Sequence, residues 1–160
     1  MGADLYIKNL PRDLQYTGFR TDPDIGYFRD SYNRSNLLWQ FDLSYWNDMK
    51  QWVNEEGEMT VQKAIEFLEE LKKREPIFEK NMQKLADRVN RIWDYHTDYK
   101  TNETTYQPED FSQKDKEGKE TKSDARARLE WIKHYQDDYK VLKRFLKKAI
   151  ELKSGIICSL

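Results

Sequence analysis

Residues Gly26–Asn33 read GYFRDSYN, and their conformation decides how the amino-terminal third of the chain is built. They close a region, residues 11–35, that also contains Pro11 and Pro23. Proline lacks a backbone donor and glycine permits unusual φ angles, so both residue types interrupt regular elements. We therefore expect residues 11–35 to form an ordered irregular loop that is anchored by its aromatic side chains.

Two short apolar segments lie at opposite ends of the sequence. Residues 3–7, ADLYI, precede Pro11 and have the aromatic and β-branched composition of a strand. Residues 156–160, IICSL, form a second short apolar run. We predict that the two segments pair as a small two-stranded ribbon that ties the termini together.

A first helical pattern starts near Ser35 or Asn36, either of which can cap a helix by accepting a backbone N–H bond. Trp39 and Trp46 widen its apolar face, which indicates contacts on two sides. The pattern predicts a helix that ends at residues 54–57. The apolar residues that recur at helical spacing are Leu37, Leu38, Phe41, Tyr45, Met49, Trp52 and Val53.

Three more helical patterns follow. The second starts after Thr60 as its cap, and Pro76 ends it or begins the next. The third covers about residues 77–99 and the fourth about residues 123–153. Gly155 is the expected carboxyl-terminal cap of the fourth helix.

The fold class that these patterns predict is mainly α. We expect a single domain over residues 1–160, a helical bundle of about four helices with a small two-stranded β annex formed by the termini. Five Trp, ten Tyr and seven Phe supply the large buried areas that a disordered chain lacks. Residues 101–122 are polar and charged, so they predict a mobile surface loop.

The charged residues nearly cancel, with 28 basic and 29 acidic side chains. A net charge of −1 gives no overall field for nucleic acid or an anionic membrane, so we expect neither as a partner. The sequence shows no membrane-spanning run and no signal-peptide pattern, which favours a cytoplasmic protein. Basic residues crowd the last turns of the fourth helix and suit its negative end; they are Lys143, Arg144, Lys147, Lys148 and Lys153.

The stretch GYFRDSYN has two interpretations. It contains two tyrosines and an arginine, residue types that dominate protein interfaces, so it is a candidate partner-binding surface. Alternatively, its Arg and Asp satisfy buried backbone groups while its aromatic side chains fill the mouth of the bundle. The candidate partner-binding residues are Tyr27, Phe28, Arg29, Asp30, Tyr32 and Asn33, with Trp39 and Trp46 beside them.

A metal site is a second hypothesis. His134 has Glu130 and Asp138 four residues away on either side, so the three share one helical face. His96 on the preceding helix would join them if the two helices are antiparallel, and such ligands suit Zn, Fe or Mn. Acid–histidine pairs on solvated faces are common in a chain this charged, so no metal and no cofactor is predicted.

The start MGADLYI, the stretch GYFRDSYN and the run LLWQFDLSYW together resemble an uncharacterised group of small bacterial and phage-encoded proteins. The match covers about the first third of the chain. Asp42 stands where this group is expected to have Gly, and Tyr45 where it is expected to have Trp. The resemblance implies a bacterial, phage or mobile-element origin and no particular activity.

Together these observations favour a non-enzymatic binding protein that contacts another protein. The alternative is a small all-α metal-dependent hydrolase or ligand-binding protein that uses acids and histidines of the third and fourth helices. A third hypothesis is a homodimer formed through the doubly apolar first helix.

Overall fold

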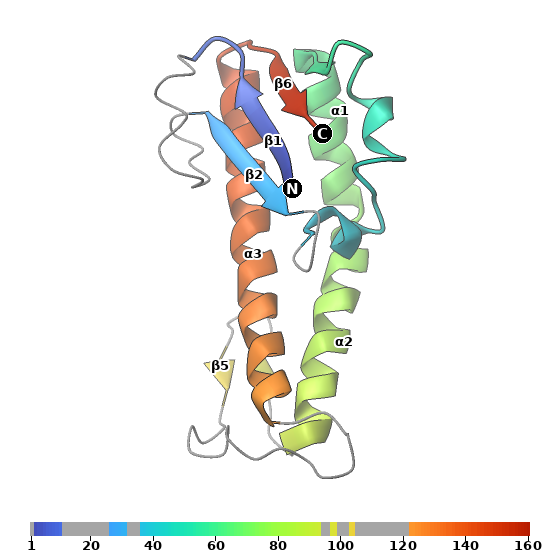
Figure 1. The fold of residues 1–160 in the computed structure, drawn as a ribbon, viewed down its shortest axis with the longest axis vertical. Coiled ribbons are helices and arrows are strands. Elements are labelled where there is room, and N and C mark those ends of the chain that lie inside the picture. Colours follow the sequence, from blue (N-terminus) through green and yellow to red (C-terminus); the bar gives the residue numbers. More distant parts are fainter. Residues whose placement is uncertain (1, 11–25, 32–35, 94–96, 99–102, 105–121) are drawn as a thin grey trace.

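The structure, a computed structural model, describes residues 2–10, 26–31, 36–93, 97–98, 103–104 and 122–160. Over these ranges the fold combines helices with an antiparallel sheet (Figure 1). The helices are α1 (Val61–Lys73), α2 (Glu75–Trp93) and α3 (Lys122–Glu151), with the short 3-10 helices η2 (Leu38–Phe41) and η3 (Met49–Gln51). The strands are β1 (Gly2–Ile7), β2 (Tyr27–Ser31), β3 (Glu58–Met59), β4 (Thr97–Asp98), β5 (Glu103–Thr104) and β6 (Ile156–Ser159).

The main sheet has the strand order β2-β1-β6-β3, and every neighbouring pair is antiparallel. Its two central strands therefore come from opposite ends of the described chain. Side chains of β1 alternate in burial, with Ala3, Leu5 and Ile7 on the buried face. Figure 1 shows β1 and β2 over the carboxyl-terminal half of α3, with β6 beside α1. β4 and β5 form a separate two-stranded pair.

The predicted four-helix bundle with a two-stranded annex is wrong, since the described residues form three α-helices and a four-stranded sheet. The terminal segments do pair, with Leu5 opposite Cys158, but β2 and β3 extend that pair on both sides. Part of the expected irregular loop is strand β2. A strand at the edge of a sheet offers unpaired backbone groups, and residues 27–31 satisfy those of β1.

Residues 36–53, predicted as the first helix, form short 3-10 helices and turns instead. Asp42 leaves the helical path with a φ of 54°, in the left-handed region. The Ser44 N–H then donates to Asp48 Oδ2 at 2.7 Å, so a side chain takes the place of a helical carbonyl. The buried hydrophobic residues of this segment are Leu37, Leu38, Phe41, Leu43, Tyr45, Met49 and Trp52. Their spacing reflects packing into the core rather than helical turns.

Phe41 joins this segment to both long helices. Its ring stacks on Phe78 of α2 with centroids 4.8 Å apart and meets Tyr139 of α3 edge-on at 4.8 Å. The guanidinium of Arg74 also donates to the Phe41 carbonyl at 3.1 Å. Aromatic pairs of this geometry stabilise a core beyond their buried area. Residues 36–53 therefore contribute to the core.

The other three helices are present, with shifted ends. Thr60 caps α1, because its Oγ1 accepts a hydrogen bond from the Lys63 N–H at 3.2 Å. Pro76 lies in the first turn of α2, where its missing N–H leaves no helical bond unmade. α2 ends at Trp93, earlier than predicted, and α3 begins at Lys122. The predicted loop 101–122 lies almost entirely outside the described residues.

The carboxyl-terminal end of α3 shows a different cap from the expected Gly155. Lys153 adopts a φ of 49°. Its N–H donates to the Ile150 carbonyl and the Ser154 N–H donates to the Ala149 carbonyl, both at 3.0 Å. These two bonds define a Schellman motif whose left-handed position is normally glycine. Lysine therefore occupies a backbone conformation that disfavours a side chain.

Replacing Lys153 with glycine should stabilise the protein. Release of the left-handed strain outweighs the extra freedom that glycine gives the unfolded chain, so Lys153→Gly should raise the free energy of unfolding by about 0.5–1 kcal/mol. Urea denaturation measures the change. Lys153→Ala is the matched control, since it removes the same side chain and keeps the Cβ. A glycine variant no more stable than the alanine variant would contradict the assignment of strain.

Candidate functional site

Four of the eight predicted partner-binding residues lie on β2, and three of these four are buried. Tyr27, Phe28 and Asp30 are buried, and Arg29 is half-buried. Phe28 points to the core, where its ring lies 6.1 Å from that of Phe145 on α3. Tyr32 and Asn33 lie outside the described residues. Trp39 and Trp46 are the candidates that remain well exposed.

Tyr27 and Arg29 belong to a polar cluster on the face of β1 and β2 opposite Phe28. The Tyr27 hydroxyl donates to Asp4 Oδ1 at 2.5 Å, and Arg29 Nη1 lies 3.6 Å from the same carboxylate oxygen. The ring of Tyr6 stacks on that of Tyr27 at 5.1 Å. Burial and the bond to Asp4 raise the pKa of Tyr27 to about 12. These contacts hold the two strands together, so the polar side chains are occupied within the sheet.

Asp30 connects β2 to the segment that follows it. Its Oδ2 accepts hydrogen bonds from the Leu37 N–H at 2.9 Å and from the Tyr45 hydroxyl at 2.8 Å. The carboxylate is buried, and a buried carboxylate is stabilised only when donors replace its water. This is the contact that the structural interpretation of GYFRDSYN anticipates. It fixes both ends of residues 37–45.

Trp39 and Trp46 expose large parts of their indoles, 53% and 67% respectively. Trp39 lies on η2, whose buried residues face the core, and its backbone N–H donates to Asn36 Oδ1 at 3.3 Å. The neighbouring Gln40 carbonyl accepts a bond from Asn81 Nδ2 of α2 at 3.0 Å. The backbone that carries the indole is therefore held on two sides.

Trp46 lies in the same segment, between η2 and η3. It lines a shallow hollow of about 290 Å³. The other residues that line this hollow are Tyr45, Lys50, Val53, Asn54, Glu55, Gly57, Cys158 and Leu160. Trp46 thus lies close to β6, and its backbone N–H donates to Ser44 Oγ at 3.2 Å.

The metal hypothesis finds one of its contacts in the structure. His134 Nε2 lies 3.0 Å from Asp138 Oδ2, and the bond to this carboxylate raises the pKa of His134. Glu130 is exposed on the same helix. His96 lies outside the described residues. Over the described ranges, His, Cys, Asp and Glu form no group of three or more that could hold a metal ion.

Cys158 offers little as a nucleophile. Its thiol is buried in β6, and burial raises its pKa to about 12. The thiolate is the reactive form, so the side chain is protonated and inert at neutral pH. Cys158 acts as a small apolar residue of the sheet.

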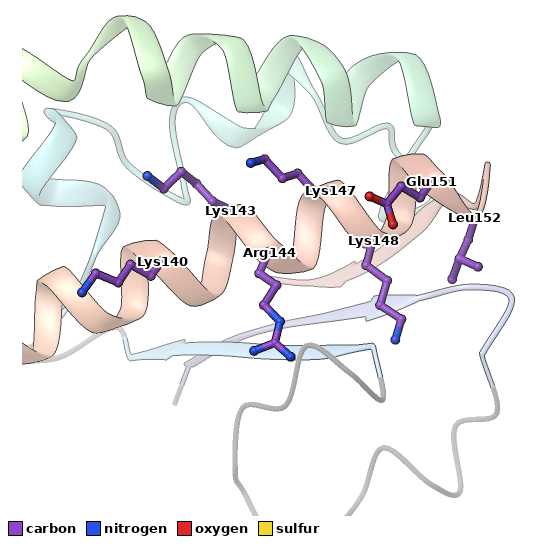
Figure 2. Close-up of a pocket in the computed structure, with 7 residues that line it drawn as sticks. All are labelled: Lys140, Lys143, Arg144, Lys147, Lys148, Glu151 and Leu152. Carbon is purple, nitrogen blue, oxygen red and sulfur yellow. The ribbon is translucent and has the colours of Figure 1, made fainter.

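Sequence reasoning missed one feature, a row of basic side chains that surround a hollow along α3 (Figure 2). The basic residues near the end of this helix were assigned to its negative end. Their separations of three and four residues are the signal that places them on one face.

No protein-family model, no curated protein and no solved structure gives a significant match to the chain. Within the described part of the chain, no helix is both long enough and apolar enough to cross a membrane.

The bond between Tyr45 and Asp30 should be measurable by denaturation. Tyr45→Phe should lower the free energy of unfolding by about 1.5–3 kcal/mol, because it removes a buried hydrogen bond to a carboxylate. In an Asp30→Ala background the same change should cost much less, since the acceptor is already gone. Guanidinium denaturation of the four proteins gives the coupling energy. Additive effects of the two substitutions would contradict a direct bond.

Asp138 should control the titration of His134. The bond between them stabilises the imidazolium, so the pKa of His134 in the folded protein is raised above its ordinary value. Asp138→Asn should lower that pKa, as measured from histidine NMR signals across a pH titration. His134→Gln assigns the signal. An unchanged pKa in Asp138→Asn would show that the ion pair does not form.

Proposed function

We propose that this chain is a non-enzymatic binding protein that contacts another protein through Trp39 and Trp46. The observation that carries the proposal is that both indoles are more than half exposed on an ordered segment. Tryptophan has the largest apolar surface of any side chain and is strongly enriched among the residues that dominate binding energy. Exposed indoles gain most from being covered by a partner.

The way in which the segment that carries Trp39 is held supports this proposal. Residues 37–45 are fixed by the Asp30 carboxylate at both ends and by the aromatic contacts of Phe41 in between. Binding through a fixed segment costs less conformational entropy than binding through a disordered one. Recognition residues on an irregular segment held by a rigid scaffold are a frequent arrangement in binding proteins.

The proposal places the protein in the cytoplasm and gives it no nucleic acid, membrane or cofactor as a partner. The resemblance to small bacterial and phage-encoded proteins remains part of it, as a proposed origin. Arg29 is half-buried and already engaged with Asp4, so it is a weaker candidate for partner contact than the indoles.

Affinity capture with substituted baits tests the role of the indoles. The natural chain, a Trp39→Ala/Trp46→Ala variant and a Leu152→Ala control would each be used as bait in lysate of the encoding organism. Leu152 is a matched control because it is an exposed apolar residue, 44% accessible, in a different part of the fold. Quantitative mass spectrometry should find a protein retained by the natural chain and the control and depleted at least about tenfold with the indole variant.

The captured protein would then be purified and its affinity measured by calorimetry. Equal capture by all three baits would contradict the proposal. The indoles could also be covered by a second copy of this chain. Light scattering across a concentration series distinguishes such a dimer from binding to an external partner. Loss of a dimer in the indole variant would replace an external partner with self-association.

A further inference from the structure

The hollow of about 290 Å³ beside Trp46 lies at the end of β6, beyond the point where β3 pairs with that strand. β1 pairs with β6 as far as Ser159, whereas β3 pairs with residues 156–157 alone. Among the described residues, no strand therefore pairs with β6 beyond residue 157 on the side away from β1. Cys158 and Leu160 line the hollow at this place.

The register of the sheet determines where the backbone groups of Cys158 point. The Lys8 N–H donates to the Gly155 carbonyl at 2.9 Å. Bonded residues alternate along an antiparallel ladder, so Cys158 directs its N–H and its carbonyl away from β1. The Cys158 N–H accordingly donates to the Gly57 carbonyl at 2.7 Å.

The Cys158 carbonyl receives no hydrogen bond in return. The Gly57 N–H, which would complete the pair, donates to the Asn54 carbonyl at 3.0 Å. Within the described part of the chain no other donor reaches the Cys158 carbonyl, although Cys158 is only 6% exposed. Buried carbonyl groups are nearly always bonded, so a donor from another molecule would satisfy this one. Gly57 leaves room for that donor, since a Cβ at residue 57 would lie 3.0 Å from the Cys158 oxygen.

Leu160 offers a donor on the same edge. The Ser159 carbonyl faces β1 opposite Asp4, and the Leu160 N–H lies trans to it in the same planar peptide group. The Leu160 N–H therefore points to the same side as the Cys158 carbonyl, and over the described ranges it has no acceptor. An acceptor and a donor thus lie next to each other along one open edge of β6.

We propose that this edge binds an extended segment of the partner protein, with one residue paired to β6 and an apolar side chain on Trp46. The inference rests on the proposed function and specifies how Trp46 is covered. A residue that runs parallel to β6, opposite Ser159, can donate its N–H to the Cys158 carbonyl and accept from the Leu160 N–H. Gly57 occupies the next position along the edge, so the segment ends or turns there and continues past Leu160.

The side chains around the hollow suit an apolar residue of this segment. The indole of Trp46 is 67% exposed, Leu160 is 37% exposed and Val53 is half-buried. Side chains alternate along an extended chain, so the neighbours of the paired residue lie on the sheet face that carries Cys158 and Leu160. These two residues line the same hollow as the indole, which an apolar side chain of the segment can therefore cover.

The size and charge of the hollow favour a peptide side chain over a small molecule. Its volume of about 290 Å³ is at the lower limit of the roughly 300–1,000 Å³ that small-molecule sites have. Lys50 and Glu55 are its charged lining residues and have opposite signs. The hollow therefore has no excess charge that would select an anion or a cation.

Peptide selection followed by NMR tests the inference. A phage-displayed library of random linear nonapeptides would be selected on the natural chain, with the Trp46→Ala chain as counter-target. The selected peptides should share an apolar position and bind the natural chain at least about tenfold more tightly than Trp46→Ala. In the ¹⁵N-labelled protein, a synthetic copy of a selected peptide should shift the Leu160 amide proton downfield, because this N–H gains an acceptor.

Two matched comparisons isolate the backbone bonds. N-methylation of each peptide residue in turn removes one donor, and a single position should lose about fivefold in affinity while its neighbours lose little. Leu160→Pro and Leu160→Ala both lose the leucine side chain, but only proline also lacks the N–H. Leu160→Pro should therefore bind the peptide about fivefold more weakly than Leu160→Ala. Circular dichroism checks that both variants are folded, and the N-methyl series uses the natural chain and needs no variant.

Three results would overturn the inference. If no selected peptide distinguishes the natural chain from Trp46→Ala, the hollow takes no extended segment. A flat N-methyl series with equal binding by the two Leu160 variants would remove the strand pairing, and the indole contact of the proposed function would stand. A dimer that Leu160→Pro disrupts more than Leu160→Ala would assign the edge to a second copy of this chain. The proposed function fails separately, if lysate capture is the same with and without the indoles.

Discussion

The fold depends on one buried carboxylate. Asp30 lies at the end of β2 and accepts bonds from the Leu37 N–H and the Tyr45 hydroxyl, so it fastens an edge strand to an irregular segment of the core. Without these donors the carboxylate would be a buried charge, and without the carboxylate a buried backbone N–H would lack an acceptor. Each group is tolerated in the interior because the other is there. The segment they fix carries Phe41 between the two long helices and Trp39 at the surface.

Local signals in the sequence were sufficient to locate α1, α2 and α3, although they also predicted a helix over residues 36–53 that does not form. Thr60 caps α1 because its hydroxyl accepts from a backbone N–H of the first turn, and Pro76 marked a helix boundary because proline is tolerated in the first turn of a helix and not in its interior. The pairing of residues 3–7 with 156–159 also followed from composition, since two short apolar runs need a partner. Lys153 shows the limit of such rules, because a left-handed cap is normally read from a glycine.

The rest required contacts between residues that are distant in the chain. The apolar residues between Leu37 and Trp52 have helical spacing, but Asp42 turns the chain and Asp48 captures a backbone donor, and neither event follows from periodicity. Strand β2 forms because it satisfies the unpaired backbone groups at the edge of β1. The prolines and glycines of residues 11–35 predicted an irregular loop there instead. For the site, exposure separated the candidates: Phe28 and Asp30 are interior, while Trp39 and Trp46 face water. The composition of GYFRDSYN could not distinguish a partner-binding surface from a structural segment, because both interpretations use the same residue types.

The position of β1 and β6 at the centre of the sheet constrains how the chain is made. Asp4 pairs with Ser159, so the central ladder joins residues from opposite ends of the described sequence. During synthesis β1 leaves the ribosome long before its partner exists, and only the β1–β2 hairpin can form early. Its other edge stays open until β6 emerges, which leaves a template for pairing with other chains. Such long-range closure also slows folding. Completion of the sheet is therefore a late event in folding, and nascent chains that still lack β6 are the species most exposed to aggregation.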